Sequence, residues 1–221
     1  MRSFNAVLFD LDGTLVDSAP DFYHLVTNMR KERNVSSTLD YETLRRSVSN
    51  GGKAVIQTAF QIEPEHPDFD DLLVQLLTEY EKQPALHSRL FDGFNELLEW
   101  LDQEKILWGV VTNKPSRFTH KILQQLHLNQ RCSSIICPED VSASKPSPEG
   151  LLLACQQMNI APQKTLYVGD HIRDIQAGHA AGMTTVAAGF GYLAINESID
   201  DWSSHFKVDH ATELLSLLQS M

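Results

Sequence analysis

The sequence has little cysteine, and its three cysteines do not follow the spacing of a known sulfur site. Cys132, Cys137 and Cys155 are odd in number, and no two of them form a C-x-x-C pair. A disulfide-stapled fold and a zinc site built on paired cysteines are therefore both disfavoured. We expect three free thiols, buried or partly buried.

Long apolar runs are also missing. No run approaches the roughly 20 residues that a membrane-spanning helix needs. The N-terminal run 6–11 is interrupted by Asp10 and is too short for the core of a signal peptide. These absences favour a cytoplasmic protein without a membrane partner.

Positive charge is scarce relative to negative charge. The chain has 18 Lys and Arg against 29 Asp and Glu, which gives a formal net charge of −11. Binding to nucleic acid depends on basic patches that neutralise phosphates, so we expect no nucleic-acid partner. We expect instead a small-molecule ligand and a chain that is a monomer or a weak homodimer.

The first chemical motif follows the apolar run 6–9, which is typical of a buried strand. Asp10 and Asp12 come directly after it, and Gly13 and Thr14 complete the motif. Residues two apart on an extended chain point to the same side, so both carboxylates can converge on one site. Such a pair favours a hard cation and offers a nucleophile and an acid/base. The alternative is an ordinary Asp-Gly turn.

Three later apolar runs also end at polar groups. Thr112-Asn113-Lys114 follows the run 107–111, Lys145-Pro146 follows the run 134–137 after a short loop, and Gly169-Asp170 with Asp174 follows the run 165–168. Ligands in open α/β sheets bind outside the carboxyl ends of the strands, where these groups would meet. Taken singly, Thr112 could be a plain strand end, Lys145 a solvated loop lysine, and the two aspartates a helix start.

The chain changes character between the first strand and the others. Residues 18–90 have helical periodicity and little strand signal, whereas strands alternate with helices from residue 91 onward. Alternating strands and helices predict a parallel sheet with right-handed crossovers. We therefore expect an α/β fold, a doubly wound parallel sheet of the Rossmann type formed by residues 1–17 and 91–221, with a helical insertion at 18–90.

The four motifs, in this order and at these spacings, resemble those of the haloacid dehalogenase (HAD) superfamily of phosphohydrolases. The resemblance covers essentially the whole chain. It is strongest to the phosphoglycolate-phosphatase-like group, which shares FDLDGTLVDS, SKPSPE and a GD-x-x-x-D stretch. It implies that residues 18–90 form a mobile α-helical cap, and that the enzyme hydrolyses phosphate monoesters.

The resemblance also implies a role for each motif. Asp10 is expected to be the nucleophile that forms an aspartyl-phosphate, and Asp12 the general acid/base. Thr112 and Lys145 would bind the transferring phosphoryl oxygens. Mg²⁺ suits an oxygen-only site, and its implied ligands are Asp10, the backbone carbonyl of Asp12, and Asp170, with Asp174 behind them.

Two segments are candidates for contact with the rest of the substrate. In Asn50-Gly51-Gly52-Lys53, the glycines allow close approach of the backbone, and Lys53 could meet an anion or hydroxyls. The alternative for this segment is a helix–helix turn. Asn113 could line the entrance of the site, although it could equally be a structural residue.

Substrate and reaction stay partly open. The candidate substrates are N-acetylmuramic acid 6-phosphate, a sugar phosphate of cell-wall recycling, and 2-phosphoglycolate. A phosphomutase of the β-phosphoglucomutase type is the alternative to a hydrolase, because the same motifs can pass the phosphoryl group to a sugar hydroxyl instead of water.

Overall fold

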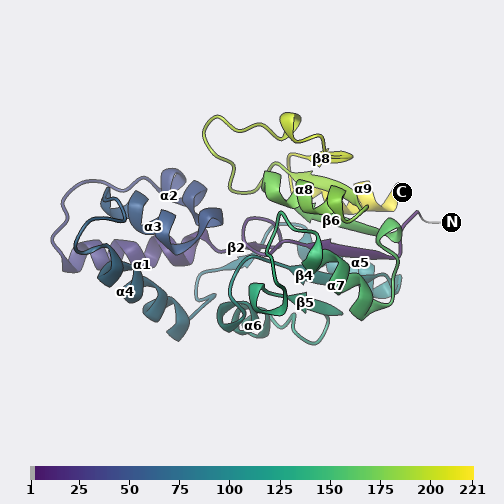
Figure 1. Ribbon diagram of the computed structural model, residues 1–221, viewed down its shortest axis with the longest axis horizontal. Coiled ribbons are helices and arrows are strands. Elements are labelled where there is room, and N and C mark those ends of the chain that lie inside the picture. The colour runs from purple at the N-terminus through teal and green to yellow at the C-terminus, as the bar shows by residue number, and fades with distance from the viewer. Residues whose placement is uncertain (1–2) are drawn as a thin grey trace.

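The computed structural model describes residues 3–221, and its centre is a six-stranded sheet in which all neighbouring strands are parallel (Figure 1). The strand order is β5-β4-β1-β6-β7-β8. The strands are β1 (Ala6–Phe9), β4 (Leu107–Val111), β5 (Ser134–Ile136), β6 (Thr165–Gly169), β7 (Thr184–Ala188) and β8 (Phe206–Val208). The expected parallel-sheet α/β class is confirmed.

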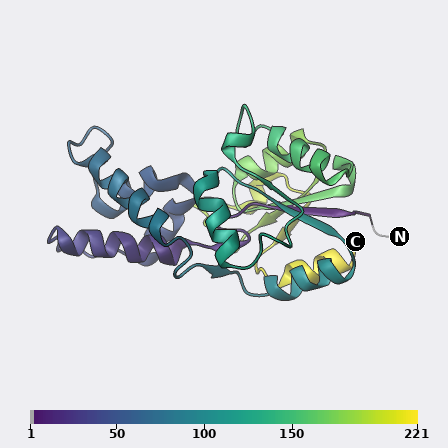
Figure 2. The same cartoon turned by 90° about the horizontal axis from the view of Figure 1, so that it is seen from below.

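Helices cover both faces of this sheet (Figure 2). They are α5 (Phe94–Gln103), α6 (Ser116–Gln125), α7 (Glu149–Met158), α8 (Ile172–Ala180) and α9 (Glu213–Gln219), with short 3-10 helices η2 (Pro138–Asp140), η3 (Pro162–Lys164) and η4 (Ile199–Trp202). None of the helices in residues 3–221 is both long and apolar enough to cross a membrane.

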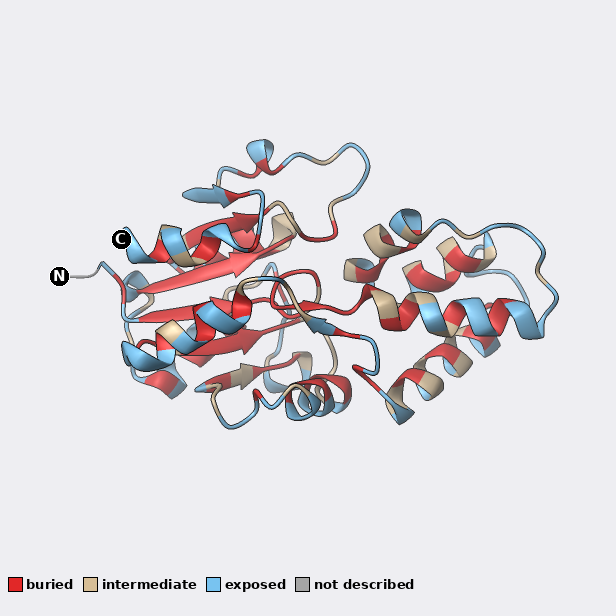
Figure 3. Ribbon diagram, turned by 180° about the vertical axis from the view of Figure 1, so that it is seen from behind, coloured by how far each residue is buried: buried red, intermediate tan, exposed pale blue. Residues whose placement is uncertain are grey.

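The central strand β1 contributes side chains to the apolar layers on both faces of the sheet. Successive side chains of a strand point to opposite faces. Val7 and Phe9 belong to the apolar cluster that includes α5 and α9, whereas Ala6 and Leu8 belong to the cluster that includes α7. All four are fully buried, as the red strands of Figure 3 show. Burial on both faces explains why this strand is an uninterrupted apolar run.

Residues 18–90 fold as a separate group of helices beyond the carboxyl ends of the strands (Figure 1). The group contains α1 (Ala19–Glu32), α2 (Tyr41–Ser47), the 3-10 helix η1 (Val48–Asn50), α3 (Gly51–Phe60) and α4 (Phe69–Lys82). The chain enters and leaves the group through two short strands, β2 (Val16–Asp17) and β3 (Arg89–Leu90), which pair antiparallel. The two crossings therefore lie side by side.

The structure corrects the expectation of a turn at Asn50-Gly51-Gly52. Asn50 ends η1, and Gly51 and Gly52 already form the first turn of α3. Gly51 has a φ of 81°, which accounts for the abrupt start of the helix. A Cβ on Gly52 would lie only 3.1 Å from a methyl group of Leu73, so the second glycine lets α3 and α4 pack closely.

Candidate functional site

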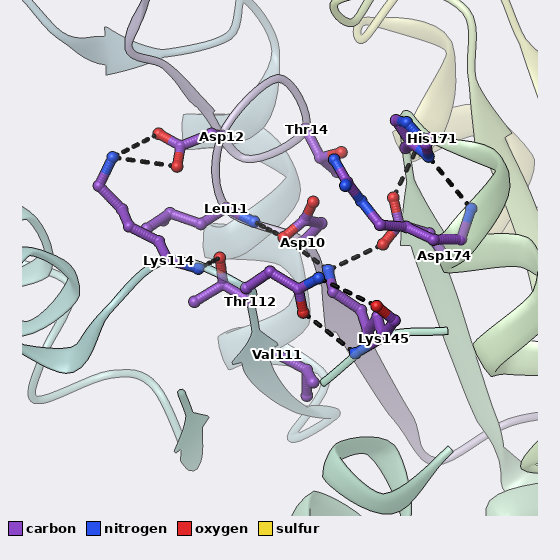
Figure 4. Close-up of polar contacts among 12 residues, drawn as sticks. Asp10, Leu11, Asp12, Thr14, Val111, Thr112, Lys114, Lys145, His171 and Asp174 are labelled. Atoms are coloured by element: carbon purple, nitrogen blue, oxygen red, sulfur yellow. Dashed lines mark hydrogen bonds and ion pairs between the residues drawn. The ribbon is translucent and has the colours of Figure 1, made fainter. Parts of the chain in front are cut away.

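The polar groups of the four motifs meet at the carboxyl edge of the sheet (Figure 4). Asp10 follows β1, Thr112 follows β4, and Asp170 follows β6. Lys145 lies in the loop after β5, and its ammonium reaches the same place. Parallel strands end at one edge, so residues far apart in the sequence come together there.

The ammonium of Lys145 lies between two carboxylates. Its Nζ is 2.8 Å from Oδ1 of Asp10 and 2.8 Å from Oδ1 of Asp174. The Lys145 side chain is only 3% exposed. Burial opposes the charged form of this lysine, but the two carboxylates outweigh that effect and raise its pKa. Lys145 is therefore a fixed positive charge beside Asp10.

Tyr167 also contacts the ammonium of Lys145, and the sequence did not identify it as a site residue. Its hydroxyl accepts a hydrogen bond from Lys145 at 2.8 Å. The carbonyl of Val111 at 3.1 Å and Oδ1 of Asp174 at 3.2 Å are both within reach of its single proton. Tyr167 is an ordinary residue of the buried strand β6, so no sequence signal distinguishes it from a core aromatic.

The carboxylate of Asp170 is buried, and both of its oxygens accept hydrogen bonds from the protein. The hydroxyl of Thr14 donates to Oδ1 at 3.0 Å, and the backbone N–H of Tyr192 donates to Oδ2 at 2.9 Å. Gly13 has a φ of 83°, and a Cβ there would lie 2.1 Å from Oδ2 of Asp170, so only glycine fits. Burial, followed by the negative charge of Asp10, raises the pKa of Asp170 to about 7.

The carboxylates make a donor set that suits a divalent cation. Asp10, Asp170 and Asp174 each offer an oxygen, and these oxygens lie within 4.8 Å of one another. Oxygen-only ligands are what hard cations prefer. Each of the three also has protein partners, Asp174 among them, which binds Lys145 and accepts the backbone N–H of His171 at 3.0 Å. The residues present fit a bound cation, and the choice of Asp10 and Asp170 as direct ligands stays a prediction.

Asp12 faces a second lysine rather than Lys145. The ammonium of Lys114 lies 3.1 Å from Oδ1 and 3.0 Å from Oδ2 of Asp12. The hydroxyl of Ser18 also donates to Oδ1. Burial opposes the charged form of Lys114, but Asp12 and Tyr80 together outweigh that effect and raise the pKa of this lysine. The sequence placed Lys114 just after the apolar run 107–111 but did not indicate that it holds Asp12.

Thr112 and Asn113 follow β4 as expected, but their polar groups already have protein partners. The hydroxyl of Thr112 accepts the backbone N–H of Lys114 at 3.1 Å and is nearly buried. The amide of Asn113 donates to the carbonyl of Lys145 and accepts its backbone N–H, each at 3.1 Å. Asn113 thus fixes the loop that carries Lys145, and its contact with substrate stays a prediction.

A cavity of about 420 Å³ connects this edge to the helices of residues 18–90. Asp10 and Asp12 line it from the sheet side, and Gly52 and Lys53 line it from the first turn of α3. Lys53 is exposed. The structure therefore brings every residue of the predicted substrate segment to the same opening as the two carboxylates.

Contacts that the sequence did not predict join the helices to this edge of the sheet. The hydroxyl of Ser49 lies 3.4 Å from Oδ2 of Asp170, and Arg173 donates to the carbonyl of Ser49. Arg45 donates to the carbonyl of Gly191 at 3.0 Å. These side chains lie far apart in the sequence, which gives no indication that they meet.

Comparison with known proteins agrees with this geometry. The family described as haloacid dehalogenase-like hydrolase matches residues 7–188. The chain is 43% identical over 215 residues to the N-acetylmuramic acid 6-phosphate phosphatase of Pseudomonas putida KT2440, a match that covers 97% of this chain and 96% of that protein. It is 39% identical over 217 residues to the phosphoglycolate phosphatase of Xanthomonas campestris pv. campestris, covering 97% and 96%.

Comparison with solved structures also finds a related protein. The crystal structure of a predicted phosphoglycolate phosphatase from Haemophilus somnus 129pt has a TM-score of 0.83 and 27% sequence identity to this chain. The superposition covers 98% of this chain and 99% of that one, so it includes the helices of residues 18–90 as well as the sheet. The chain therefore belongs to the haloacid dehalogenase-like hydrolases.

Proposed function

We propose that this protein is a Mg²⁺-dependent phosphomonoesterase that works through an aspartyl-phosphate on Asp10. The observation that carries the proposal is the position of Asp10. Its side chain lines the cavity, and its Oδ1 lies 2.8 Å from the ammonium of Lys145. Asp12 lines the same cavity. A carboxylate nucleophile, a fixed cation and a second carboxylate for proton transfer are what a two-step phosphoryl transfer needs.

In the first step, an oxygen of Asp10 bonds to phosphorus while the bond between phosphorus and the ester oxygen breaks. Asp12, in its protonated form, gives its proton to the departing oxygen, so the leaving group departs as an alcohol. The Leu11 N–H at 2.7 Å and the Lys145 ammonium at 2.8 Å both hold Oδ1 of Asp10. The nucleophile is therefore oriented before the substrate binds.

In the second step, the ionised Asp12 takes a proton from a water molecule as the water oxygen attacks phosphorus. The bond between phosphorus and Asp10 breaks, and inorganic phosphate leaves. One residue serves both steps because the proton lost in the first is regained in the second. Lys145 stays in place throughout and offsets the charge on the phosphoryl oxygens.

Asp10, Asp170 and the backbone carbonyl of Asp12 would hold Mg²⁺, with Asp174 orienting the cluster from behind. The bound cation supplies Lewis-acid stabilisation of the phosphoryl oxygens. The hydroxyl of Thr112, which lines the same cavity as Asp10 and is nearly buried, would bind one of these oxygens.

Residues 18–90 are proposed to be a cap, and residues 1–17 with 91–221 the catalytic core. The antiparallel pair of β2 and β3 supports this division, because it confines both connections to one narrow strip. Lys53 and Gly52 lie on the cap side of the cavity, so the cap is proposed to select the leaving group. Asn113 is proposed to act at the same opening from the core side.

The proposed substrate is N-acetylmuramic acid 6-phosphate or 2-phosphoglycolate, the compounds in the names of the two relatives described above. The test is phosphate release from a panel of phosphate monoesters with Mg²⁺, in which these two should have the highest kcat/KM. Release of phosphate from a single ester without a bisphosphate primer supports a hydrolase. Conversion of a sugar phosphate into its isomer, with no phosphate released, would instead indicate the mutase.

A further inference from the structure

Tyr80 carries a buried hydroxyl that has no hydrogen-bond partner within residues 3–221. The residue is only 1% exposed, and a buried hydroxyl without a partner weakens the folded state. The Ser204 hydroxyl shares this condition but does not line the cavity at the candidate site, whereas Tyr80 does. A buried polar group without a partner requires an explanation, and in a binding cavity the simplest one is a ligand.

The ring of Tyr80 packs against three neighbouring side chains. Phe22 stacks on it at 4.5 Å between centroids, and Phe118 packs at 5.4 Å. The ammonium of Lys114 lies over the ring, 4.7 Å from its centroid, and is near enough to the hydroxyl to act on its pKa, but the two do not have the geometry of a hydrogen bond. The ring is therefore fixed by three neighbours.

Apolar side chains surround the ring of Tyr80 within the cavity. Leu77 and Leu73 lie one and two turns before Tyr80 on α4 and line the cavity, as do Phe22 and Phe118. A hydroxyl at the edge of such an apolar patch gives a binding site directional specificity, because its hydrogen bond fixes the position of one polar atom of the ligand.

The hydroxyl is available as a donor at any ordinary pH. Burial is the main reason that the pKa of Tyr80 lies well above its usual value, and the charge of Asp12 acts in the same direction. The group therefore keeps its proton. A neutral phenol can donate to a hydroxyl, ether or carboxylate oxygen of a ligand.

We propose that the Tyr80 hydroxyl binds an oxygen of the leaving group other than the ester oxygen. This inference rests on the proposed phosphatase activity and refines its substrate class. The preferred substrates are phosphate esters whose leaving group carries a further oxygen acceptor, such as sugar phosphates and phosphorylated hydroxy acids. Esters of plain alcohols and phenols lack the atom that Tyr80 binds. A site built around such a hydrogen bond discriminates strongly against ligands that cannot make it.

The test is the variant Tyr80→Phe, which removes the hydroxyl and keeps the ring. We measure kcat/KM for the better of N-acetylmuramic acid 6-phosphate and 2-phosphoglycolate, and for phenyl phosphate, whose leaving group has no second oxygen. The kcat/KM for the preferred ester, divided by that for phenyl phosphate, should fall by about tenfold to a hundredfold. The melting temperature should not fall, because the lost hydroxyl has no partner in the protein.

Tyr23→Phe is the matched control. Its hydroxyl donates to the carbonyl of Leu39 at 3.3 Å and lies on α1, outside this cavity. The inference is overturned if the substrate ratio of Tyr80→Phe stays at the wild-type value, or if both substrates lose activity together with a lower melting temperature. Failure of the wild-type protein to release phosphate from any ester overturns the proposed function as well. An unchanged ratio in an active enzyme overturns the role of Tyr80 alone.

Discussion

The ammonium of Lys114 lies 3.0 Å from Oδ2 of Asp12, although 102 positions separate the two residues in the chain. Lys114 is nearly buried, and its ammonium also lies over the rings of Phe22, from α1, and Tyr80, from α4. The carboxylate proposed to transfer the proton is thus held by a core lysine that is itself covered by helices of the proposed cap.

This contact predicts that Lys114→Gln lowers kcat by about tenfold to a hundredfold, because Asp12 loses the group that orients it. KM should change less, since the phosphoryl site around Lys145 is intact. Loss of stability should stay below the roughly 3–5 kcal/mol that breaking a fully buried ion pair costs, because Asp12 keeps some access to water. Steady-state phosphate release and a thermal melt measure these effects.

Lys114→Arg is the conservative control, because it keeps a positive charge beside Asp12. It should recover part of the kcat lost in Lys114→Gln. A Lys114→Gln enzyme with wild-type kcat would show that Ser18 alone is sufficient to hold Asp12.

The strand ends could be predicted because their signal is local. Each of the residues Asp10, Thr112 and Asp170 follows an apolar run directly, and parallel strands carry such residues to one edge. The strand β8 could not be predicted, because it has three residues and two of them are exposed. Its apolar signal is too short to separate it from a loop.

The partners of the site residues were not predictable for a different reason. The pairing of Lys114 with Asp12 and the hydroxyl of Tyr167 below Lys145 depend on the relative placement of separate elements. Helical or strand periodicity says which face a side chain lies on, but not which atom it meets. The start of α3 at Gly51 was missed because two glycines in a row usually indicate a turn.

The proposed nucleophile predicts that Asp10→Asn retains less than about one hundredth of wild-type activity, because the amide cannot replace the carboxylate as the nucleophile. The fold should be little weakened, because the change removes one of three clustered carboxylates and so reduces their mutual repulsion, while Lys145 keeps its contact with Asp174. Phosphate release and a thermal melt test both points. Asp71→Asn, at an exposed position on α4, is the control and should behave as wild type. Substantial turnover by Asp10→Asn would rule out the covalent route.

The carboxylate cluster predicts an absolute requirement for a divalent cation. Treatment with EDTA should abolish activity, Mg²⁺ should restore it, and Ca²⁺ should inhibit, because Ca²⁺ prefers more ligands and a looser geometry. Mg²⁺ should also raise the melting temperature of the wild-type protein, since a ligand of the native state stabilises it. Asp170→Asn should lose this thermal shift. Full activity after exhaustive chelation would contradict the proposed metal site.

The three cysteines are predicted to be unreactive in the folded protein. All three are free, and burial raises the pKa of Cys132 to about 12 and that of Cys137 to about 11. Burial also raises the pKa of Cys155. The thiolate is the reactive form, so at pH 8 iodoacetamide should label the native protein far more slowly than the chain unfolded in guanidinium. Mass spectrometry gives the extent of labelling at each cysteine. Rapid native labelling at Cys137 would show that this thiol is more accessible than its environment indicates.

The proposed cap predicts that Lys53 affects the choice of substrate more than the chemistry. Lys53 is exposed and lines the cavity from the first turn of α3, beside Gly52. Lys53→Ala should raise KM for the preferred ester by about tenfold, because an interaction made equally in the ground and transition states appears in KM alone. Hydrolysis of p-nitrophenyl phosphate should change much less. Lys31→Ala, an exposed lysine on α1 outside the cavity, is the matched control. Equal losses on both esters would place Lys53 at the phosphoryl group or in the fold, and no loss on either would leave it a solvated residue of α3.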